Sequence, residues 1–227
     1  MGDAFEAEKA GRPDAGRGNK QIKYVLAFFG AFNPPTRAHL GLADFAFRAS
    51  GREGVLFVPS RSDYIRDEQR KDGVFSSEER LAMLRKLAET RPWMAVTDWE
   101  LRRPEQPRSY VTLCALREEG FSPSLLMGSD KLREFTSWRF VPEIAREFGI
   151  VCLARGKDSC RRIIEEDPLL KELEEHITVL DTPDDWKDFS SSAVREALRR
   201  GLDGEVRRMV PEEILDRLCK RSGRNRP

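Results

Sequence analysis

The stretch YVLAFFGAFNPPTRAHLGL, residues 24–42, joins three local patterns and sets the fold of the chain. An apolar run typical of a buried strand ends at Gly30, where a glycine permits close approach of another backbone. Pro34 and Pro35 then fix the shape of a loop. Apolar residues at helical spacing follow and predict a helix over residues 37–50, with His39 in its first turn. A strand therefore delivers one of the 2 histidines of the chain to the start of a helix.

The same alternation of strand and helix continues along the chain. The expected strands cover residues 23–29, 54–60, 93–97, 124–128, 149–155 and 176–181. The expected helices cover residues 37–50, 76–90, 109–120, 141–148, 158–175, 190–201 and 211–220, and residues 61–75 are expected to form a long polar loop. Strands that alternate with helices indicate βαβ units, so we expect an α/β fold with a single doubly wound, mostly parallel sheet.

The composition of the 227-residue chain limits the classes of function. Lys and Arg number 40 and Asp and Glu 39, so the net charge of +1 gives no overall basic field, and no nucleic-acid partner is expected. No run approaches the roughly 18 apolar residues of a membrane helix. The 4 cysteines show no C-x-x-C pairing and are typical of reduced thiols in a cytoplasmic protein. We expect one domain over residues 21–220 between disordered tails at residues 1–20 and 221–227.

Ligands of such parallel sheets bind beyond the carboxyl ends of the strands. That rule selects residues 30–39, 59–73, 128–138 and the segment before the SSSAVR helix. The first segment has neither the G-x-G-x-x-G of a hydride-transferring dinucleotide fold nor the G-K-[ST] of a Walker loop. The free N–H groups and dipole of a helix start favour phosphate, so the loop with His39 predicts a phosphate cradle. A histidine between alanine and leucine is on its own more typical of core packing, and the glycine and two prolines that precede it shift the interpretation towards function.

Two motifs resemble signatures of the nucleotidylyltransferase superfamily. The segment GAFNPPTRAHL, residues 30–40, is similar to the signature loop of the nicotinamide and nicotinate mononucleotide adenylyltransferases. The usual H-x-G-H of that family is TRAH here, with Thr36 in place of the first histidine, as in the eukaryotic-type members. FSSSAVR, residues 189–195, resembles the family's (I)SS-T-x-x-R, with Ser192 in place of threonine. Three hydroxyls at a helix start supply a cap and phosphate donors, and Arg195 follows one turn later.

The resemblance implies a role for each matching residue. His39 and Arg195 would be the catalytic residues. Contacts to ATP and its phosphates would come from Gly30, Ala31, Phe32, Thr36, Gly128, Asp130, Arg155, Ser190, Ser191 and Ser192. Contacts to the mononucleotide would come from Phe32, Asn33, Arg66, Trp93 and Trp138.

The middle of the chain carries the part of this resemblance that concerns the nucleosides. In LLMGSDKLREFTSW, residues 125–138, Asp130 would accept ribose hydroxyls and Trp138 would stack on the pyridine ring. In SDYIR, Arg66 would reach phosphate where the family usually has lysine. Trp93 would also face the pyridine, although a tryptophan that opens a strand fits the rim of the core nearly as well.

The implied reaction is attack of the mononucleotide 5′-phosphate on the α-phosphorus of ATP, which gives NAD or nicotinate adenine dinucleotide plus pyrophosphate. The chain shows no carboxylate cage, so Mg²⁺ is expected to arrive on the triphosphate, and no metal site of the protein's own is predicted. Two alternatives are another nucleotidylyl transfer, such as cytidylyl transfer to a phosphate ester, and a non-catalytic nucleotide-binding regulator. The sequence leaves open the choice between acid and amide mononucleotide, and whether the chain forms a homo-oligomer.

Overall fold

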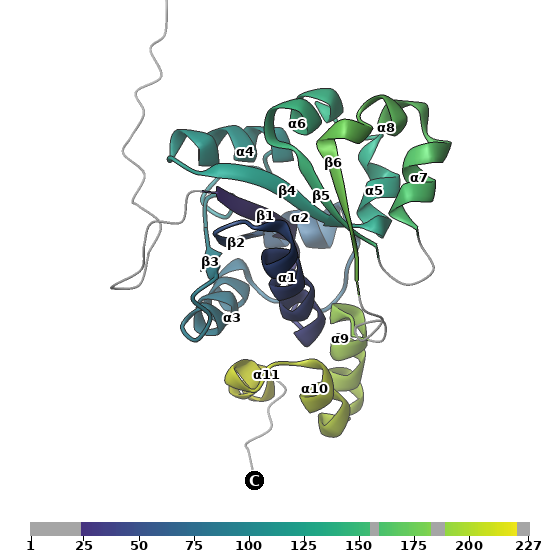
Figure 1. The fold of residues 1–227 in the computed structure, drawn as a ribbon. Coiled ribbons are helices and arrows are strands. Elements are labelled where there is room, and N and C mark those ends of the chain that lie inside the picture. Colours follow the sequence, from purple (N-terminus) through teal and green to yellow (C-terminus); the bar gives the residue numbers. More distant parts are fainter. Residues whose placement is uncertain (1–23, 155–158, 183–188, 222–227) are drawn as a thin grey trace, which may run out of the picture.

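The computed structural model describes residues 24–154, 159–182 and 189–221. Six parallel strands form one sheet in the order β3-β2-β1-β4-β5-β6 (Figure 1). The strands are β1 (Tyr24–Gly30), β2 (Gly54–Pro59), β3 (Met94–Val96), β4 (Ser122–Gly128), β5 (Ile150–Ala154) and β6 (Ile177–Asp181). The helices are α1 (Arg37–Ser50), α2 (Ser62–Asp67), α3 (Ser77–Ala88), α4 (Ser109–Glu118), α5 (Ser129–Phe135), α6 (Val141–Phe148), α7 (Cys160–Glu166), α8 (Pro168–Glu172), α9 (Ser191–Arg200), α10 (Asp203–Met209) and α11 (Leu215–Arg221), with 3-10 turns η1 (Glu174–His176) and η3 (Glu212–Ile214).

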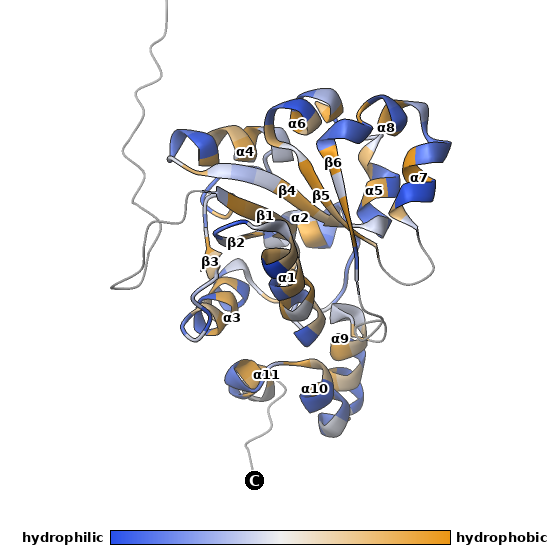
Figure 2. Cartoon of the chain, in the orientation of Figure 1, coloured by the Kyte–Doolittle hydropathy of each residue, from blue (hydrophilic) through white to orange (hydrophobic). Residues whose placement is uncertain are grey.

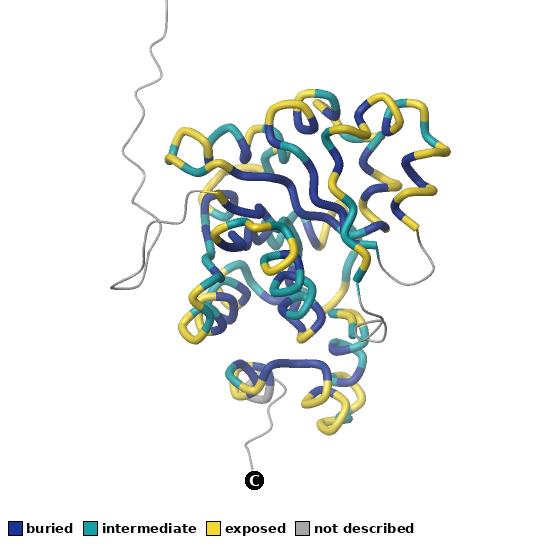
Figure 3. Tube along the Cα trace, in the orientation of Figure 1, coloured by how far each residue is buried: buried dark blue, intermediate teal, exposed yellow. Residues whose placement is uncertain are grey.

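Helices cover both faces of the sheet, and the strands are among the most hydrophobic elements (Figure 2). Neighbouring strand residues belong to two different apolar layers. On one face, Leu26 and Phe57 pack with apolar residues of α1, α3, α9, α10 and α11. On the other face, Ala27 and Leu56 pack with α4, α5, α6, α7 and α8. Burial on both faces explains the continuous apolar runs of the sequence, and β2 is buried along its whole length (Figure 3). The prediction of a doubly wound sheet is confirmed, and every strand pair is parallel.

The strand order reverses at β1, which pairs with β2 on one side and with β4 on the other. Such a switch point leaves a crevice outside the carboxyl ends of the two strands, because the connections leave in opposite directions. The loops that follow Gly30 and Gly128 therefore flank the crevice. No described helix is both long and apolar enough to cross a membrane.

Helix boundaries follow the local capping chemistry. The helix α1 has the predicted bounds and ends at Gly51, whose φ of 66° lies in the left-handed region that glycine tolerates. The helix α3 begins after Ser76, which forms the expected capping box with Glu79.

Three short helices form where the sequence predicts none. The helix α2 lies in the expected polar loop and buries Ile65. The helix α5 buries Leu132 and Phe135, and α10 buries Val206 and Met209. Each contributes only one or two apolar side chains to the core, which is too little periodicity for recognition from sequence.

The expected helix over residues 158–175 is divided into α7, α8 and η1. The break falls at Asp167, whose carboxylate accepts the N–H groups of Leu169 and Leu170 and so caps α8. Pro168 takes the first position of α8, where a missing N–H costs nothing. The last helix, expected over residues 211–220, starts at Leu215 after η3 and includes Arg221. Residues 1–20 and 222–227, where tails are expected, lie outside the described residues.

Candidate active site

His39 lies in the first turn of α1, and the residue that caps the helix holds its ring. The Thr36 hydroxyl accepts the His39 N–H at 3.4 Å, and the Thr36 N–H donates to His39 Nδ1 at 3.0 Å. Thr36 Oγ1 also lies 2.8 Å from Nδ1. A backbone N–H can only donate, so Nδ1 is an acceptor and Nε2 carries the proton of the neutral imidazole. The outer nitrogen of the ring is therefore a hydrogen-bond donor.

The same contacts give Thr36 a role that the sequence does not predict. Its side chain is fully buried and its hydroxyl is hydrogen-bonded to His39 on both the backbone and the ring. The hydroxyl thus caps α1 and orients the histidine, where the sequence suggests a phosphate contact.

The turn after β1 is tightened by Phe32, whose φ of 44° lies in the left-handed region. Its buried ring covers Gly30, and a Cβ on that glycine would lie 3.0 Å from the ring. The ring also meets His39 edge-on, with centroids 5.2 Å apart. Gly30 is therefore needed for this packing, and only the backbone of Phe32 remains for a ligand.

Asn33 links three parts of the chain. Its side-chain oxygen accepts the Phe75 N–H at 2.8 Å, and its backbone carbonyl accepts a hydrogen bond from Arg195 at 2.8 Å. Its Nδ2 is buried and has no hydrogen-bond partner among the described residues. A buried donor left in this state costs about 1–3 kcal/mol, which a ligand oxygen would recover.

The start of α9 is bound to the loop after β1, although the two segments lie far apart in sequence. The Ser191 hydroxyl donates to the Pro34 carbonyl at 2.8 Å, and Arg195 reaches both Asn33 and the Ser192 hydroxyl. Ser190 is the N-cap of α9, where its side chain accepts the Ala193 N–H. The structure therefore brings together the two motifs that the sequence predicts to meet.

Lys71, in the segment between α2 and α3, is a basic residue of the site that sequence reasoning misses. Burial lowers its pKa below the ordinary value, and the positive charges of Lys131 and Arg195 lower the pKa further. The negative charges of Glu134 and Asp130 raise the pKa of Lys71, but by less. Burial also lowers the pKa of Arg195. Cations that repel one another in a partly buried place are stabilised by a bound anion. We call residues 30–39, the start of α9 and Lys71 the cradle.

Arg66, which the sequence suggests for a phosphate contact, is exposed near the end of α2 and pairs with Asp67 at 3.1 Å. Lys71 follows five residues later in the same segment and is the one that interacts with Arg195. Four basic residues occur in RSDYIRDEQRK, residues 61–71, and no periodicity distinguishes the one that faces the cradle.

The loop after β4 brings Gly128 and Asp130 to the other side of the crevice. A Cβ at Gly128 would lie 2.7 Å from the Asp130 carboxylate, so a larger residue there would force that carboxylate to move. Asp130 is exposed in the first turn of α5. Trp138 follows α5 and is half-buried, with its ring edge-on to Phe135 at 5.4 Å. Arg155 lies outside the described residues.

The fold does not bring Trp93 to the cradle. It precedes the first residue of β3 and stacks on Phe47 near the end of α1, with centroids 6.0 Å apart. Because all strands are parallel, Trp93 lies at the amino ends of the strands, whereas His39 lies beyond their carboxyl ends. We therefore place Trp93 in the core rim and leave it out of the candidate site.

A buried carboxylate supports the loop beyond β3. Glu100 accepts hydrogen bonds from Gln106 at 2.6 Å and Thr112 at 2.8 Å. Burial raises its pKa to about 7 despite both hydrogen bonds. Gln106 in turn accepts the N–H of Arg61 just after β2, so Glu100 fixes the loop after β3 to the segment that follows β2.

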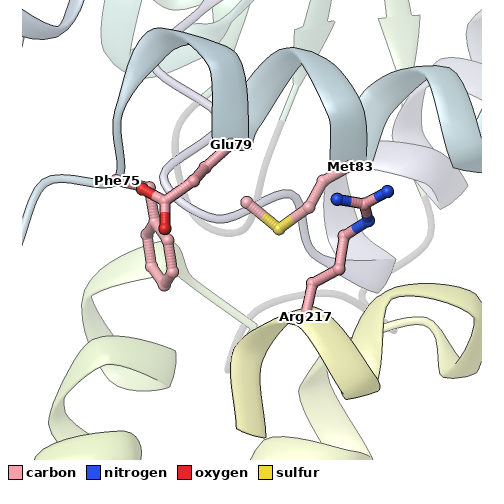
Figure 4. A pocket seen from close by; sticks show the side chains of 4 residues that line it. All are labelled: Phe75, Glu79, Met83 and Arg217. Atoms are coloured by element: carbon pink, nitrogen blue, oxygen red, sulfur yellow. The ribbon is translucent and has the colours of Figure 1, made fainter. Parts of the chain in front are cut away.

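A small hollow of about 160 Å³ lies between α3 and α11 (Figure 4). Phe75, Glu79, Met83 and Arg217 line it. Sites for small ligands usually measure roughly 300–1,000 Å³, so we assign no substrate to this hollow.

Comparison with known proteins decides the family. The sequence model of the family described as cytidylyltransferase-like matches residues 27–197, which is most of the chain. The chain belongs to the cytidylyltransferase-like family. The match begins within β1 and ends within α9, so it includes both elements that form the cradle of this family member.

Two plant members are similar to this cytidylyltransferase-like protein over most of their length. The nicotinamide/nicotinic acid mononucleotide adenylyltransferase of Oryza sativa subsp. japonica is 28% identical over 89% of this chain and 86% of its own. The Arabidopsis thaliana protein of the same name is 28% identical over 85% and 86%. The Plasmodium falciparum nicotinic acid mononucleotide adenylyltransferase, solved with NaAD, has a TM-score of 0.71 at 17% identity and covers 89% of this chain and 98% of its own. That likeness confirms the fold.

Proposed function

We propose that this protein transfers the adenylyl group of ATP to nicotinamide or nicotinate mononucleotide and releases pyrophosphate. The observation that carries the proposal is the cradle at the switch point of the sheet. His39 lies there in the first turn of α1, Arg195 donates to the Asn33 carbonyl, and the positive charge of Arg195 lowers the pKa of Lys71. The names of the plant relatives and of the Plasmodium structure support the choice of substrates.

The reaction joins two phosphates. An oxygen of the mononucleotide 5′-phosphate bonds to the α-phosphorus of ATP, while the bond from that phosphorus to the bridging oxygen of the β-phosphate breaks. The electron pair of the broken bond leaves on pyrophosphate. The attacking phosphate is already an anion at neutral pH, so no general base is required. Catalysis then rests on holding two polyanions in line and stabilising their charge.

The cradle supplies groups of the right kind for this task. His39 donates from Nε2 to the reacting phosphates, because Nδ1 is held by Thr36. Arg195 and Lys71 neutralise negative charge, and Lys71 takes the phosphate role that the sequence suggests for Arg66. The unpaired Nδ2 of Asn33 is a buried donor for the mononucleotide.

The parts of the substrates that do not react bind on the β4 side of the crevice. Gly128 allows the backbone to approach the nucleotide and Asp130 accepts ribose hydroxyls. Trp138 stacks on the pyridine ring. No three His, Cys, Asp or Glu side chains of the described residues are grouped to hold a metal. A hydrated Mg²⁺ that arrives on the triphosphate fits this donor set, because Mg²⁺ on nucleotides keeps several waters and few protein ligands.

Product formation tests the proposal. The purified protein with Mg²⁺ is supplied with ATP or CTP, and with nicotinamide mononucleotide, nicotinate mononucleotide or glycerol 3-phosphate as acceptor. We expect dinucleotide and pyrophosphate only from ATP with either mononucleotide. Turnover of CTP with glycerol 3-phosphate instead would establish cytidylyl transfer. Binding of ATP without turnover of any acceptor would establish a non-catalytic regulator.

A further inference from the structure

Residues 62–77 form a loop whose two ends meet. The Ser62 N–H donates to the Ser77 hydroxyl at 3.2 Å, and the Ser62 hydroxyl donates to the Phe75 carbonyl at 3.0 Å. The two hydroxyls lie 3.1 Å apart. We call residues 62–77 the 62–77 loop and the place where its ends meet the neck.

Arg80 lies beneath the neck and is fully buried. Its guanidinium donates to three backbone carbonyls and two hydroxyls: Ala31 O at 2.7 Å, Ser60 O at 2.5 Å, Phe75 O at 3.3 Å, Ser62 Oγ at 3.0 Å and Ser77 Oγ at 3.4 Å. These acceptors belong to the loop after β1, the end of β2 and both ends of the 62–77 loop. One side chain therefore ties four segments together.

The charge of Arg80 makes this arrangement costly. Every acceptor that it reaches is neutral, and burial lowers its pKa to about 10, so the side chain remains a cation at neutral pH. Buried charges are usually paired with a carboxylate, and replacing them with apolar side chains is often stabilising. The guanidinium of Arg80 instead holds five acceptors of the surrounding loops in place, which an apolar side chain cannot do.

The 62–77 loop, whose two ends Arg80 holds together, also contacts the cradle. Lys71 is half-buried two residues before Gly73, and the positive charge of Arg195 helps to lower its pKa. A Cβ on Gly73 would lie 3.4 Å from Arg195 Cδ, so the loop passes directly over that side chain. Phe75 donates its N–H to Asn33. The neck thus lies between Arg80 on one side and the residues that face the phosphates on the other.

We propose that Arg80 is a positioning residue for adenylyl transfer: it closes the neck of the 62–77 loop and thereby holds Lys71 beside Arg195. This inference rests on the proposed function, because the phosphates that Lys71 meets are those of the adenylyl transfer. Arg80 acts through the loop and does not touch substrate.

A double-mutant cycle tests this coupling. Lys71→Ala, Arg80→Met and the double variant are compared by kcat, by KM for the mononucleotide and by melting temperature. If Arg80 acts through Lys71, Arg80→Met raises KM at least about tenfold, and Lys71→Ala adds little further change in that background, because residues that act as a unit are not additive. Arg85→Met is the matched control on α3, since Arg85 is exposed and pairs with Asp98 at 3.5 Å. Equal effects of Lys71→Ala in both backgrounds would overturn the proposal.

A second measurement does not depend on activity. Amide hydrogen exchange should speed up across residues 62–77 in Arg80→Met, while β1 and β4 keep their protection, because no acceptor of Arg80 lies within either strand. If Arg80→Met does not fold, Arg80→Lys serves instead. It keeps the charge, reaches fewer acceptors and should show a smaller change in the same direction. Unchanged exchange in the loop contradicts the positioning role. A wild-type protein that forms no dinucleotide contradicts the proposed function alone, and the exchange experiment still reports on the neck.

Discussion

The two ring nitrogens of His39 have different tasks, and two substitutions separate them. Nδ1 accepts the Thr36 N–H at 3.0 Å and completes the cap of α1, whereas Nε2 is the donor assigned to the phosphates. In His39→Asn, the side-chain oxygen reaches the position of Nδ1 and keeps the cap, but nothing replaces Nε2. In His39→Gln, the longer amide places its NH₂ near the position of Nε2 and loses the acceptor for Thr36.

The magnitudes follow from these contacts. Removing one preorganised donor to a developing negative charge costs ~10²–10³ in rate, or roughly 3–4 kcal/mol of barrier. Losing a helix cap costs about 1 kcal/mol of stability. In a protein of this size, that loss lowers the melting temperature by about 2–4 °C. We therefore expect His39→Asn to melt like wild type with kcat reduced by about 10²–10³, and His39→Gln to melt about 3 °C lower with more of its kcat retained.

Initial rates at saturating ATP and mononucleotide give kcat, and circular dichroism gives the melting temperature and the folded fraction. KM for the mononucleotide should stay within a few-fold in His39→Asn, because many contacts share ground-state binding. A His39→Asn protein with near-normal kcat per folded molecule would refute the reasoning. The histidine would then serve packing and capping only.

Three further predictions concern other parts of the site. Lys71→Ala should raise KM for the mononucleotide about tenfold or more, the cost of one charge-assisted phosphate contact, whereas Arg66→Ala should stay within about twofold because Arg66 is an exposed ion-pair residue. Comparable losses in both variants would show that the wrong cation has been chosen. Trp138→Ala should weaken mononucleotide binding by about 1–3 kcal/mol in calorimetry and leave ATP binding unchanged; equal losses for both substrates would indicate a folding defect. Burial raises the pKa of Glu100 from 4.5 to about 7, so between these values the folded state holds a proton that the unfolded chain has lost. The free energy of unfolding in urea should therefore fall as pH rises through that window, by up to about 3 kcal/mol, and Glu100→Gln should flatten this dependence.

The sequence predicts the fold well where the periodic signal is long. The helix of residues 37–50 and the six strands follow from apolar patterns that are sustained over whole elements. The short helix α5 lacks such a pattern because it has only two apolar residues, Leu132 and Phe135, and both face the core. The helix expected over residues 158–175 is broken before Pro168. The apolar pattern on both sides of this proline predicts one continuous helix and so hides the break. Strand order is set by packing between distant segments, and local spacing carries no record of it.

The sequence predicts candidate site residues best where they belong to a recognisable motif. The loop around His39 and the start of α9 meet as expected, through the contact from Arg195 to Asn33. Lys71 could not be distinguished from Arg66 by sequence, because its burial depends on how the 62–77 loop folds back. Arg80 looks like any surface arginine of a polar helix until the loops above it are in place. Trp93 is the opposite case. It matches the family resemblance, but in the fold it stacks on Phe47 at the amino ends of the strands, away from His39.

The fate of each phosphorus atom of ATP tests the central claim most directly. The protein is incubated with Mg²⁺, with nicotinamide and nicotinate mononucleotide together, and with ATP labelled with ³²P at either the α or the γ position, and the products are separated by chromatography. Adenylyl transfer at the cradle predicts that the α label enters the dinucleotide and the γ label appears only in pyrophosphate. A γ label on the mononucleotide, or an α label that never leaves ATP while the mononucleotide is bound, would contradict the account.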